Sequence, residues 1–358
     1  MYPKPFEGKR ILVTGGTGSL GKVLIPRLLA AVDGDPAKII VFSRDEAKQH
    51  QMRLEYQNKT AATEEIIYHN FQQKLEFRIG DVRDHHSVEA VMPDVDIVFN
   101  AAALKQVPTC EYFPYESVKT NIEGAENIVR AIQKYKLQVE AVIGISTDKA
   151  CKPVNVMGMS KAIQERIFIQ ANMRCPRTRF VCARYGNVLA SRGSVIPLFQ
   201  DQIRRRGPVT ITSPEMTRFL LSLEEAVDTV FAAVREGLPG ETFIPRVRSA
   251  LVINLARALI GGRDINLEIS GTRPGEKLHE SLVSEEEALR TVNRGKYYVI
   301  QPMLPEVVGD GHDRNEPCLQ REYSSADNVM DLEQTAALLK QHRLMVEDMV
   351  QETVEVLR

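Results

Sequence analysis

Short apolar runs alternate with segments of helical periodicity through the first half of the chain. The runs are rich in Val, Ile and Phe and mostly apolar on both faces, which is typical of parallel strands covered by helices on each side. We expect strands at residues 10–14, 38–43, 74–79, 94–100, 140–146 and 179–184, and helices at 19–31, 118–135 and 156–173. This alternation predicts an α/β fold with a doubly wound parallel sheet.

The rhythm changes after Tyr185, where loops separate isolated helical patterns. The patterns lie at residues 223–236, 250–259, 332–343 and 346–357. We therefore expect a sheet domain in residues 1–190 with a returning segment at about 222–248. A smaller C-terminal lobe and a C-terminal tail would occupy residues 191–221 and 249–358.

Composition narrows the class of protein without indicating a chemistry. The chain has 358 residues, 43% of them hydrophobic and 26% charged, as in an ordinary soluble globular protein. A formal charge of −1 gives no electrostatic footprint for nucleic acid or for an anionic membrane. No secretory signal opens the sequence, and no apolar run is long enough to cross a bilayer. We expect a cytoplasmic protein with no membrane insertion.

The five cysteines are scattered and odd in number. They are Cys110, Cys151, Cys175, Cys182 and Cys318, and their spacing fits no metal site. Reduced thiols are the ordinary state of such cysteines in the cytoplasm. We expect neither disulfides nor a bound metal.

A glycine-rich loop follows the first predicted strand and opens a helix. Gly15, Gly18 and Gly21 have the spacing that permits a tight turn, close approach of the backbone to a pyrophosphate and packing of the helix on the strand. The helix N-terminus adds N–H donors for phosphate. The sequence therefore predicts a Rossmann-type dinucleotide site, with contacts from Gly15, Thr17, Gly18, Ser19, Leu20 and Gly21.

The end of the second strand bears on which dinucleotide binds. An acid there usually holds the ribose 2′-hydroxyl of NAD, whereas an arginine accommodates the 2′-phosphate of NADP. Ser43 and Arg44 occupy the discriminating position, Asp45 lies one step further and Lys48 follows one turn later. An arginine can form the paired contacts that a phosphate prefers, so we expect NADP, with NAD as the less favoured alternative.

The next two strand ends carry further candidates for the dinucleotide site. Asp81 and Val82 follow the third strand, where they would contact the adenine. Ala101 and Ala102 follow the fourth, and their small side chains would let the cofactor lie close to the backbone. Each pair alone could be turn chemistry, but their serial order at successive strand ends favours a cofactor.

An acid and an amine stand side by side just past the fifth strand. Asp148 and Lys149 follow Thr147, and Lys161 projects from the helix that comes next. Burial and the charge of Lys161 would both lower the pKa of Lys149, while desolvation would keep Asp148 protonated and a close ammonium would oppose this. We expect a coupled pair that shares one proton. The plain alternative is an ion pair at a strand end on the surface.

These motifs together resemble the extended short-chain dehydrogenase/reductase superfamily, and one branch of it in particular. The resemblance to UDP-N-acetylglucosamine 4,6-dehydratases, in the polysaccharide biosynthesis branch, spans roughly residues 8–285. Its motifs are Ala103–Pro108, Ser146–Ala150, Arg184–Val188, Ser191–Pro197, Met216–Phe219 and Gly271–Leu278. The resemblance implies an NADP-binding sheet domain, a nucleotide-sugar substrate lobe and a homo-oligomer, either dimer or hexamer. Members that retain C5 configuration are commonly fused to a membrane-spanning region that is not seen here, which favours the C5-inverting type by analogy.

The resemblance also implies a reaction and its groups. Hydride leaves sugar C4 for the nicotinamide, the C5 proton is removed as the C6 hydroxyl departs as water, and hydride returns to C6. Lys149 would be the C5 base and Asp148 the acid that protonates the leaving hydroxyl. Lys161 would bind the nicotinamide ribose. The superfamily usually has tyrosine where this chain has Met157, so the base for the C4 hydroxyl is left open among Asp148, Thr147 and an ordered water.

The remaining site residues are also carried by the resemblance. Tyr185 and Val188 would lie near the nicotinamide. Nucleotide-sugar contacts would come from Lys105, Lys149, Asn187, Arg192, Arg218, Arg273 and Glu276. Since a surface arginine is often only a solvated charge, we expect some of these to be bystanders. Two other functions stay open: a nucleotide-sugar epimerase, and a catalytically silent NADP-binding regulatory protein.

Overall fold

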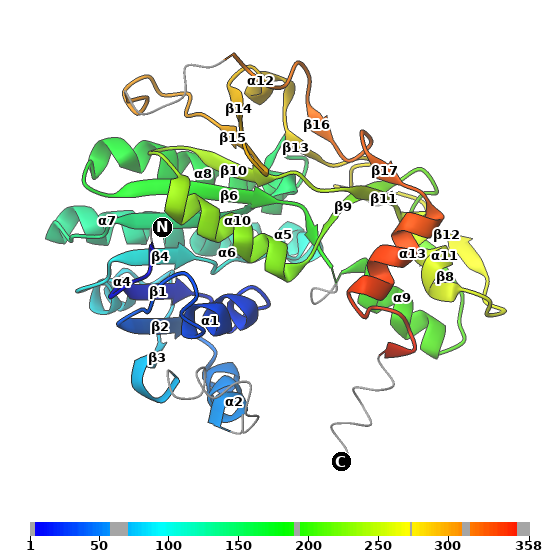
Figure 1. The fold of residues 1–358 in the computed structure, drawn as a ribbon, viewed down its shortest axis with the longest axis horizontal. Coiled ribbons are helices and arrows are strands. Elements are labelled where there is room, and N and C mark those ends of the chain that lie inside the picture. Colours follow the sequence, from blue (N-terminus) through cyan, green and yellow to red (C-terminus); the bar gives the residue numbers. More distant parts are fainter. Residues whose placement is uncertain (1–3, 58–70, 190–193, 273, 310–315, 349–358) are drawn as a thin grey trace.

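The computed structural model describes residues 4–57, 71–189, 194–272, 274–309 and 316–348. Within them, a nine-stranded sheet has the order β14-β15-β10-β6-β5-β4-β1-β2-β3 (Figure 1). Its strands are β1 (Arg10–Thr14), β2 (Lys38–Ser43), β3 (Leu75–Ile79), β4 (Ile97–Asn100), β5 (Ala141–Thr147), β6 (Arg179–Tyr185), β10 (Thr242–Pro245), β14 (Thr291–Arg294) and β15 (Tyr297–Ile300). Neighbours from β3 to β10 are parallel, and the β14–β15 hairpin adds antiparallel strands at one edge. The predicted α/β class and parallel sheet are confirmed.

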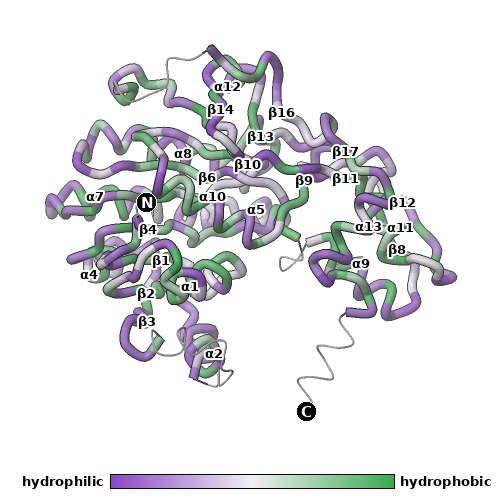
Figure 2. Tube along the Cα trace, in the orientation of Figure 1, coloured by the Kyte–Doolittle hydropathy of each residue, from purple (hydrophilic) through white to green (hydrophobic). Residues whose placement is uncertain are grey.

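Helices cover both faces of this sheet because successive strand residues point to opposite sides. Ile11 and Val13 of β1 pack into one core with α1 and α10, while Leu12 between them packs into a second core with α4, α7 and α8. Figure 2 shows how hydrophobic (green) and hydrophilic (purple) residues are distributed along these elements. The helices of this part are α1 (Gly21–Leu29), α2 (Glu46–Gln57), α4 (His85–Val91), α5 (Val107–Tyr112), α6 (Pro114–Ser117), α7 (Gly124–Tyr135), α8 (Val156–Arg174) and α10 (Leu223–Glu236).

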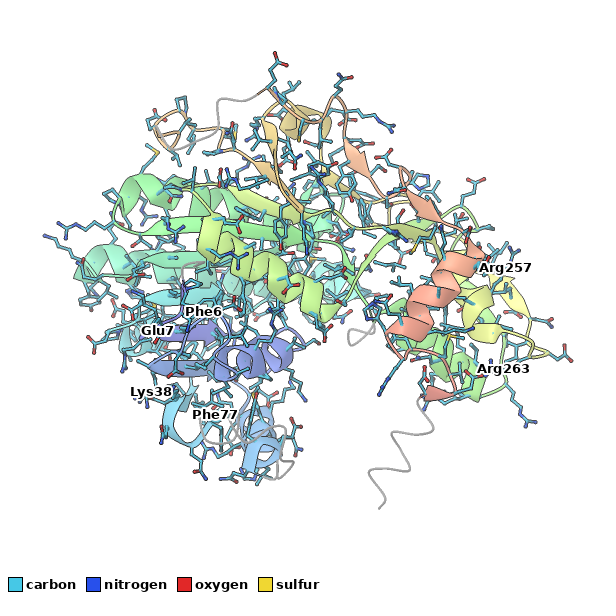
Figure 3. All side chains as sticks on the ribbon, in the orientation of Figure 1. Phe6, Glu7, Lys38, Phe77, Arg257 and Arg263 are labelled. Atoms are coloured by element: carbon cyan, nitrogen blue, oxygen red, sulfur yellow. The ribbon has the colours of Figure 1, made fainter. Side chains whose placement is uncertain are left out.

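The segment before β1 is anchored by an aromatic side chain. Phe6, labelled in Figure 3, is buried against two rings, with its ring centroid 4.7 Å from that of Phe231 and 6.2 Å from that of Phe99. Edge-to-face rings of this kind add to the area that they bury. The start of the chain is thereby fixed between β4 and α10.

A second, smaller core lies beside the main sheet. Its apolar residues come from three helices and from short strands. The helices are α9 (Val195–Arg204), α11 (Val252–Ile260) and α13 (Leu332–Gln341). A four-stranded sheet of order β17-β11-β9-β7 connects this lobe to the main sheet region, and two strand pairs, β8–β12 and β13–β16, complete it. These strands are β7 (Asn187–Val188), β8 (Val209–Ile211), β9 (Thr217–Leu221), β11 (Ser249–Leu251), β12 (Leu267–Ile269), β13 (Ser281–Val283), β16 (Tyr323–Ser324) and β17 (Val329–Met330).

Several element boundaries differ from those expected. The helix expected from residue 250 starts at Val252, because residues 249–251 pair with β9 as strand β11. Strand β4 starts at Ile97 because Asp94 has a left-handed backbone, with φ of 61°. The expected helix 118–135 begins with a π-helical turn, η2 (Val118–Glu123). The β14–β15 hairpin joins the main sheet although it lies in the range assigned to the smaller lobe. Most of the helical pattern expected at 346–357 lies outside the described residues.

A buried arginine ties the C-terminal half to the main sheet. Arg184 of β6 donates to both carboxylate oxygens of Glu165 on α8, at 2.9 and 2.6 Å, and to both of Glu287 at 2.8 Å. A fifth contact goes to the carbonyl of Leu282 at 2.9 Å. Glu287 belongs to the short helix α12 (Glu285–Ala288), and Leu282 lies on β13. All three charged side chains are buried, so one guanidinium joins the sheet, a covering helix and the segment 281–288.

The Arg184→Met variant is expected to lose about 3–5 kcal/mol of unfolding free energy, because two buried carboxylates lose their cation. Urea unfolding followed by circular dichroism measures this loss. Arg130→Met is the control, since Arg130 pairs with Glu126 on an exposed helix face and should cost less than about 1 kcal/mol. Equal midpoints for the two variants would contradict the structural role of Arg184.

Candidate active site

The glycine loop has the geometry of a close backbone approach. Gly15 has a φ of +65°, and a Cβ added to it would lie 2.7 Å from the Cα of Ala102. At Gly21 an added Cβ would lie 1.9 Å from the carbonyl oxygen of Gly16. Any side chain at either position would collide with backbone. The loop therefore lies directly against the residues that follow β4, just before the start of α1.

The predicted dinucleotide residues gather at the ends of β1 to β4. The hydroxyl of Ser43 accepts from Gln49 Nε2 at 3.0 Å and lies 3.4 Å from that of Thr17. Gln49 is buried and also donates to the carbonyl of Arg78, so it fixes the ends of β2 and β3. The main chain of Val82 is held in the same way, since its carbonyl accepts from Asn127.

Arg44 is the exposed cation of this group. Its side chain is 56% exposed, and Nη1 lies 3.7 Å from Oδ2 of Asp81. Burial raises the pKa of Asp81, but the hydrogen bonds and charge of Arg83, with Arg44, outweigh it and hold this pKa below its usual value. Lys48 forms an ion pair with Asp45. Arg44 is therefore the cation best placed to meet an added phosphate, and Lys48 is engaged elsewhere.

The acid and amine expected after β5 lie at its carboxyl end, in a single turn of 3₁₀ helix, η3 (Asp148–Ala150). Thr147 directs them, because its hydroxyl donates to Asp148 Oδ1 at 2.8 Å and accepts from the N–H of Lys149. The Asp148 side chain is only 1% exposed, whereas that of Lys149 is 22% exposed. Lys149 Nζ lies 3.1 Å from Asp148 Oδ1. The pair is thus mostly enclosed, and the surface ion pair is ruled out.

The expected direction of the Lys149 pKa was wrong. Burial alone lowers it, but the carboxylates of Asp148 and Glu280 outweigh burial and leave the pKa above its ordinary value. The neighbouring cation that opposes them is Arg218, not Lys161. Glu280 Oε1 lies 3.6 Å from Lys149 Nζ and 3.9 Å from Arg218 Nε. The amine is therefore one of four charged groups, two positive and two negative, whose formal charges sum to zero.

Lys161 is buried in α8 and donates to Oε1 of Gln164 at 2.7 Å. Burial lowers its pKa to about 8. Met157 is also buried, so the helix brings a thioether to the position where the superfamily usually has a phenol. Asn155 starts this helix by accepting from the N–H of Gly158, and its amide donates to the carbonyl of Gly275.

A buried asparagine that the sequence did not single out organises the loop after β4. Asn121 lies in the π-helical turn η2, where its amide accepts from the N–H of Leu104 and donates to the Leu104 carbonyl. It also donates to the hydroxyl of Ser160 on α8. The loop that carries Ala101 and Ala102 is thereby tied to α8. A π-helical turn has no clear signature in an apolar pattern, so no sequence signal pointed to Asn121.

The expected substrate residues are only partly brought together. Arg218 is buried beside Glu280. Asn187 Oδ1 and Glu276 Oε2 are buried atoms with no hydrogen-bond partner among the described residues. Lys105 is exposed on the loop after β4. Arg192 and Arg273 lie outside the described residues.

Tyr185 ends β6 directly beside Thr147 in the parallel register. Its side chain is buried, and burial raises the pKa of its hydroxyl. Val188 follows on β7. Gly186, which follows Tyr185 in the chain, lies close to Asp148. A Cβ added to Gly186 would be 3.6 Å from Oδ2 of Asp148. The predicted nicotinamide residues thus lie near the acid and amine.

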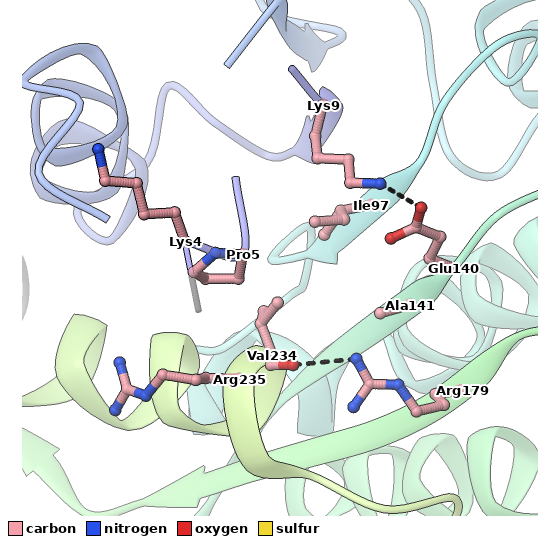
Figure 4. A pocket seen from close by; sticks show the side chains of 9 residues that line it. All are labelled: Lys4, Pro5, Lys9, Ile97, Glu140, Ala141, Arg179, Val234 and Arg235. Carbon is pink, nitrogen blue, oxygen red and sulfur yellow. Dashed lines mark hydrogen bonds and ion pairs between the residues drawn. The ribbon is translucent and has the colours of Figure 1, made fainter. Parts of the chain in front are cut away.

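Two hollows elsewhere contain none of the predicted site residues. One of about 230 Å³ lies at the opposite edge of the sheet, where the strands begin, with Lys9 paired to Glu140 and Arg179 held by the Val234 carbonyl (Figure 4). Another of about 430 Å³ lies behind the Glu280 segment, beside Lys277 and His279. In the described part of the chain, no group of three or more His, Cys, Asp or Glu side chains could hold a metal ion. None of the helices described is both long and apolar enough to span a membrane.

A family comparison agrees with this geometry. The profile of the family described as "Polysaccharide biosynthesis protein" matches residues 11–302. The chain belongs to this family. A protein named UDP-glucose 4-epimerase from Rickettsia bellii is 46% identical over 316 residues, which covers 87% of this chain and 86% of the relative. The protein of the same name from Rickettsia prowazekii is 45% identical over 315 residues, again 87% and 86% of the two chains.

Solved structures share the fold. Pen from Bacillus thuringiensis has a TM-score of 0.84 and 31% identity, covering 95% of this chain and 99% of its own. DesIV from Streptomyces venezuelae, a dTDP-glucose 4,6-dehydratase with NAD and TYD bound, has a TM-score of 0.62 at 19% identity, covering 75% and 86%. The second likeness concerns the fold alone. The fold is thus shared with proteins named as nucleotide-sugar 4,6-dehydratases and 4-epimerases.

The Gly15→Ala variant is expected to lose about 1–3 kcal/mol of stability without any ligand, because a side chain there meets a left-handed backbone and the Ala102 main chain. Thermal unfolding by calorimetry measures the loss. Gly262→Ala is the matched control, since an added Cβ there meets nothing within 4 Å. A Gly15→Ala protein as stable as this control would show that the loop can move away from Ala102.

Proposed function

We propose that this protein is an NADP-dependent 4,6-dehydratase of UDP-N-acetylglucosamine, which inverts C5 and serves surface-glycan biosynthesis. The observation that carries the proposal is the enclosed contact between Asp148 and Lys149 at the carboxyl end of β5. Ligands of α/β sheets bind at that edge. We also infer a cytoplasmic homo-oligomer, dimer or hexamer, from the family resemblance alone.

Elimination of water needs an acid and a base on the two sides of one bond. If the proton shared by the pair moves from Lys149 to Asp148, the amine becomes a free base for the C5 proton and the carboxyl becomes an acid for the C6 hydroxyl. The pair then returns to the charged state as the reaction proceeds. Asp148 takes the Lys149 proton in this scheme and its Oδ1 already accepts from Thr147 at 2.8 Å, so the C4 hydroxyl proton would pass to an ordered water in place of a phenol at position 157.

The residues at the strand ends fit a dinucleotide. At Gly15 and Gly21 any side chain would collide with neighbouring backbone, so only glycine fits. The exposed Arg44 lies beside Ser43 and Asp81. We infer NADP because Arg44 suits a 2′-phosphate, with NAD as the alternative. When bound, the nicotinamide takes hydride from C4 and returns it to C6. Lys161 would hold its ribose, with Tyr185 and Val188 alongside.

Epimerisation of a nucleotide sugar is the second candidate. The Rickettsia relatives named UDP-glucose 4-epimerase favour it, since they match 87% of this chain. A 4-epimerase, however, removes and returns hydrogen at C4 and needs no acid for a C6 hydroxyl. Enclosure of both Asp148 and Lys149 is better suited to elimination.

Product mass separates the candidates. Purified protein with UDP-N-acetylglucosamine and NADP is expected to yield a sugar lighter by one water, and proton NMR in deuterated water then reports C5 configuration. An isomer of unchanged mass would instead establish an epimerase. No turnover with this substrate or with UDP-glucose would favour a silent NADP-binding regulatory protein.

The Lys149→Ala variant is expected to lose at least about 100-fold in turnover while NADP still binds, because general base catalysis supplies a factor of this size. Steady-state kinetics and calorimetric titration with NADP measure the two properties. Lys134→Ala is the control, since that lysine pairs with Glu89 on the outside of α7. Substantial remaining turnover would refute Lys149 as the base.

The Arg44→Ala variant is expected to bind NADP about 10-fold more weakly or worse while its affinity for NAD stays the same, because it loses charge-assisted contacts to one phosphate. Titration of both dinucleotides tests this. Arg53→Ala, which removes an exposed arginine over the ring of Phe77, should change neither affinity. A parallel loss for NAD and NADP would mean that Arg44 does not discriminate between them.

A further inference from the structure

A second carboxylate lies at the acid and amine, and neither the sequence motifs nor the family resemblance assigned it a role. Glu280 is buried, with Oε1 3.6 Å from Lys149 Nζ and 3.9 Å from Arg218 Nε. Its second oxygen, Oε2, and Oδ2 of Asp148 are buried atoms without a hydrogen-bond partner among the described residues. A buried carboxylate in this state is costly unless cations offset it. Lys149 and Arg218 are the cations that do so.

The backbone around Glu280 is fixed independently of Lys149. The N–H of Glu280 donates to the hydroxyl of Ser325 at 2.9 Å, and its carbonyl accepts from the N–H of Ser325 at 2.7 Å. Two residues earlier, the Leu278 carbonyl accepts from the N–H of Thr217 and from the guanidinium of Arg218. The main chain that carries Glu280 is therefore held in place without any contact to the lysine.

Successive side chains of residues 278–281 point to opposite sides of this extended segment. Within the segment, this brings the side chain of Glu280 to face the amine. Leu278 packs with the lobe core and Glu280 turns toward Lys149, while His279 between them bonds Thr217 and lines the hollow behind. The next residue, Ser281, contacts Glu322 on that same rear side. A single strand thus separates the catalytic pair from the outer ion pairs of Lys152.

The charged groups that face Lys149 are Asp148 of its own turn, Glu280 of the segment before β13, and Arg218 of β9. With every group ionised, two positive and two negative charges balance. Transfer of one proton from Lys149 to Asp148 keeps the sum at zero and leaves Glu280 opposite Arg218. Glu280 draws the shared proton toward Lys149, and it stabilises the ammonium as that ammonium forms.

We propose that Glu280 is a positioning residue that sets the protonation state and the basicity of Lys149 through their direct ion pair, with Arg218 holding its other side. The inference rests on the proposed dehydration, in which Lys149 takes the C5 proton. It places the control of the base on a residue of the C-terminal half of the chain.

Glu280→Gln keeps the shape and removes the charge. The Lys149 pKa should fall by about one unit or more, since an opposite charge at this distance has that effect. Because the active pair holds one shared proton, loss of that proton from Lys149 limits the rate at high pH, and the basic limb of kcat/KM against pH should therefore move about one unit lower. Lys149 is also labelled with acetic anhydride across pH, and site-resolved mass spectrometry gives its midpoint without any turnover.

Glu322→Gln is the matched control, because Glu322 pairs with Lys152 at 2.7 Å in the same region and should leave both midpoints unchanged. Glu280→Asp keeps the charge at a greater distance and should give an intermediate shift, so it replaces the glutamine variant if that variant does not fold. Unchanged Lys149 labelling in both Glu280 variants, or an equal shift in Glu322→Gln, would overturn the proposal. If the unaltered protein forms no dehydrated product, the proposed function fails, while the labelling still decides whether Glu280 governs Lys149.

Discussion

The buried guanidinium of Arg184 is the constraint on which the active-site architecture depends. All of its hydrogen-bonding directions are taken by Glu165, Glu287 and the Leu282 carbonyl. Burial lowers the pKa of Arg184, but the two carboxylates outweigh it and raise this pKa above its ordinary value. Burial likewise raises the pKa of Glu287, yet Arg184 outweighs it and lowers that pKa to about 2. Arg184 and Glu287 therefore stay charged at neutral pH.

The contacts of Arg184 with Glu165, Glu287 and Leu282 determine which segment lies against the end of β5. The Leu282 carbonyl and Glu287 bring strand β13 against β6, and Glu280 lies just before that strand. Strand β6 in turn pairs with β5, so the register that places Tyr185 beside Thr147 also brings Glu280 near Lys149. Two distant parts of the chain thus form one charged cluster. A weaker attachment would leave Lys149 with Asp148 as its sole carboxylate partner.

Local signals predicted the sheet, the glycine loop and the place of the acid and amine. Each depends on residues close together in sequence: apolar runs for the strands, Gly15 and Gly21 for the turn, and Asp148 with Lys149 for the pair. The direction of the Lys149 pKa depends on Glu280 and Arg218, which tertiary packing supplies. The sequence does not show which side chains of the segment around Glu280 face inward. The contact between His279 and Thr217, which are far apart in the chain, determines this. The β14–β15 hairpin was likewise hidden, because its pairing with β10 joins segments far apart in the chain.

The formal charges of Lys149, Arg218, Asp148 and Glu280 sum to zero. This neutrality helps to explain how Asp148 and Lys149 could act as an acid and a base together. An isolated lysine in an apolar pocket would lose its proton to solvent, and the neighbouring carboxyl would then have to find a proton elsewhere. Here the cluster conserves its proton, because any state with Lys149 neutral and Asp148 ionised leaves an uncompensated buried charge. Neutral amine and protonated carboxyl therefore arise together. In the proposed dehydration, removal of a C5 proton and protonation of a C6 oxygen would thereby be coupled through one proton.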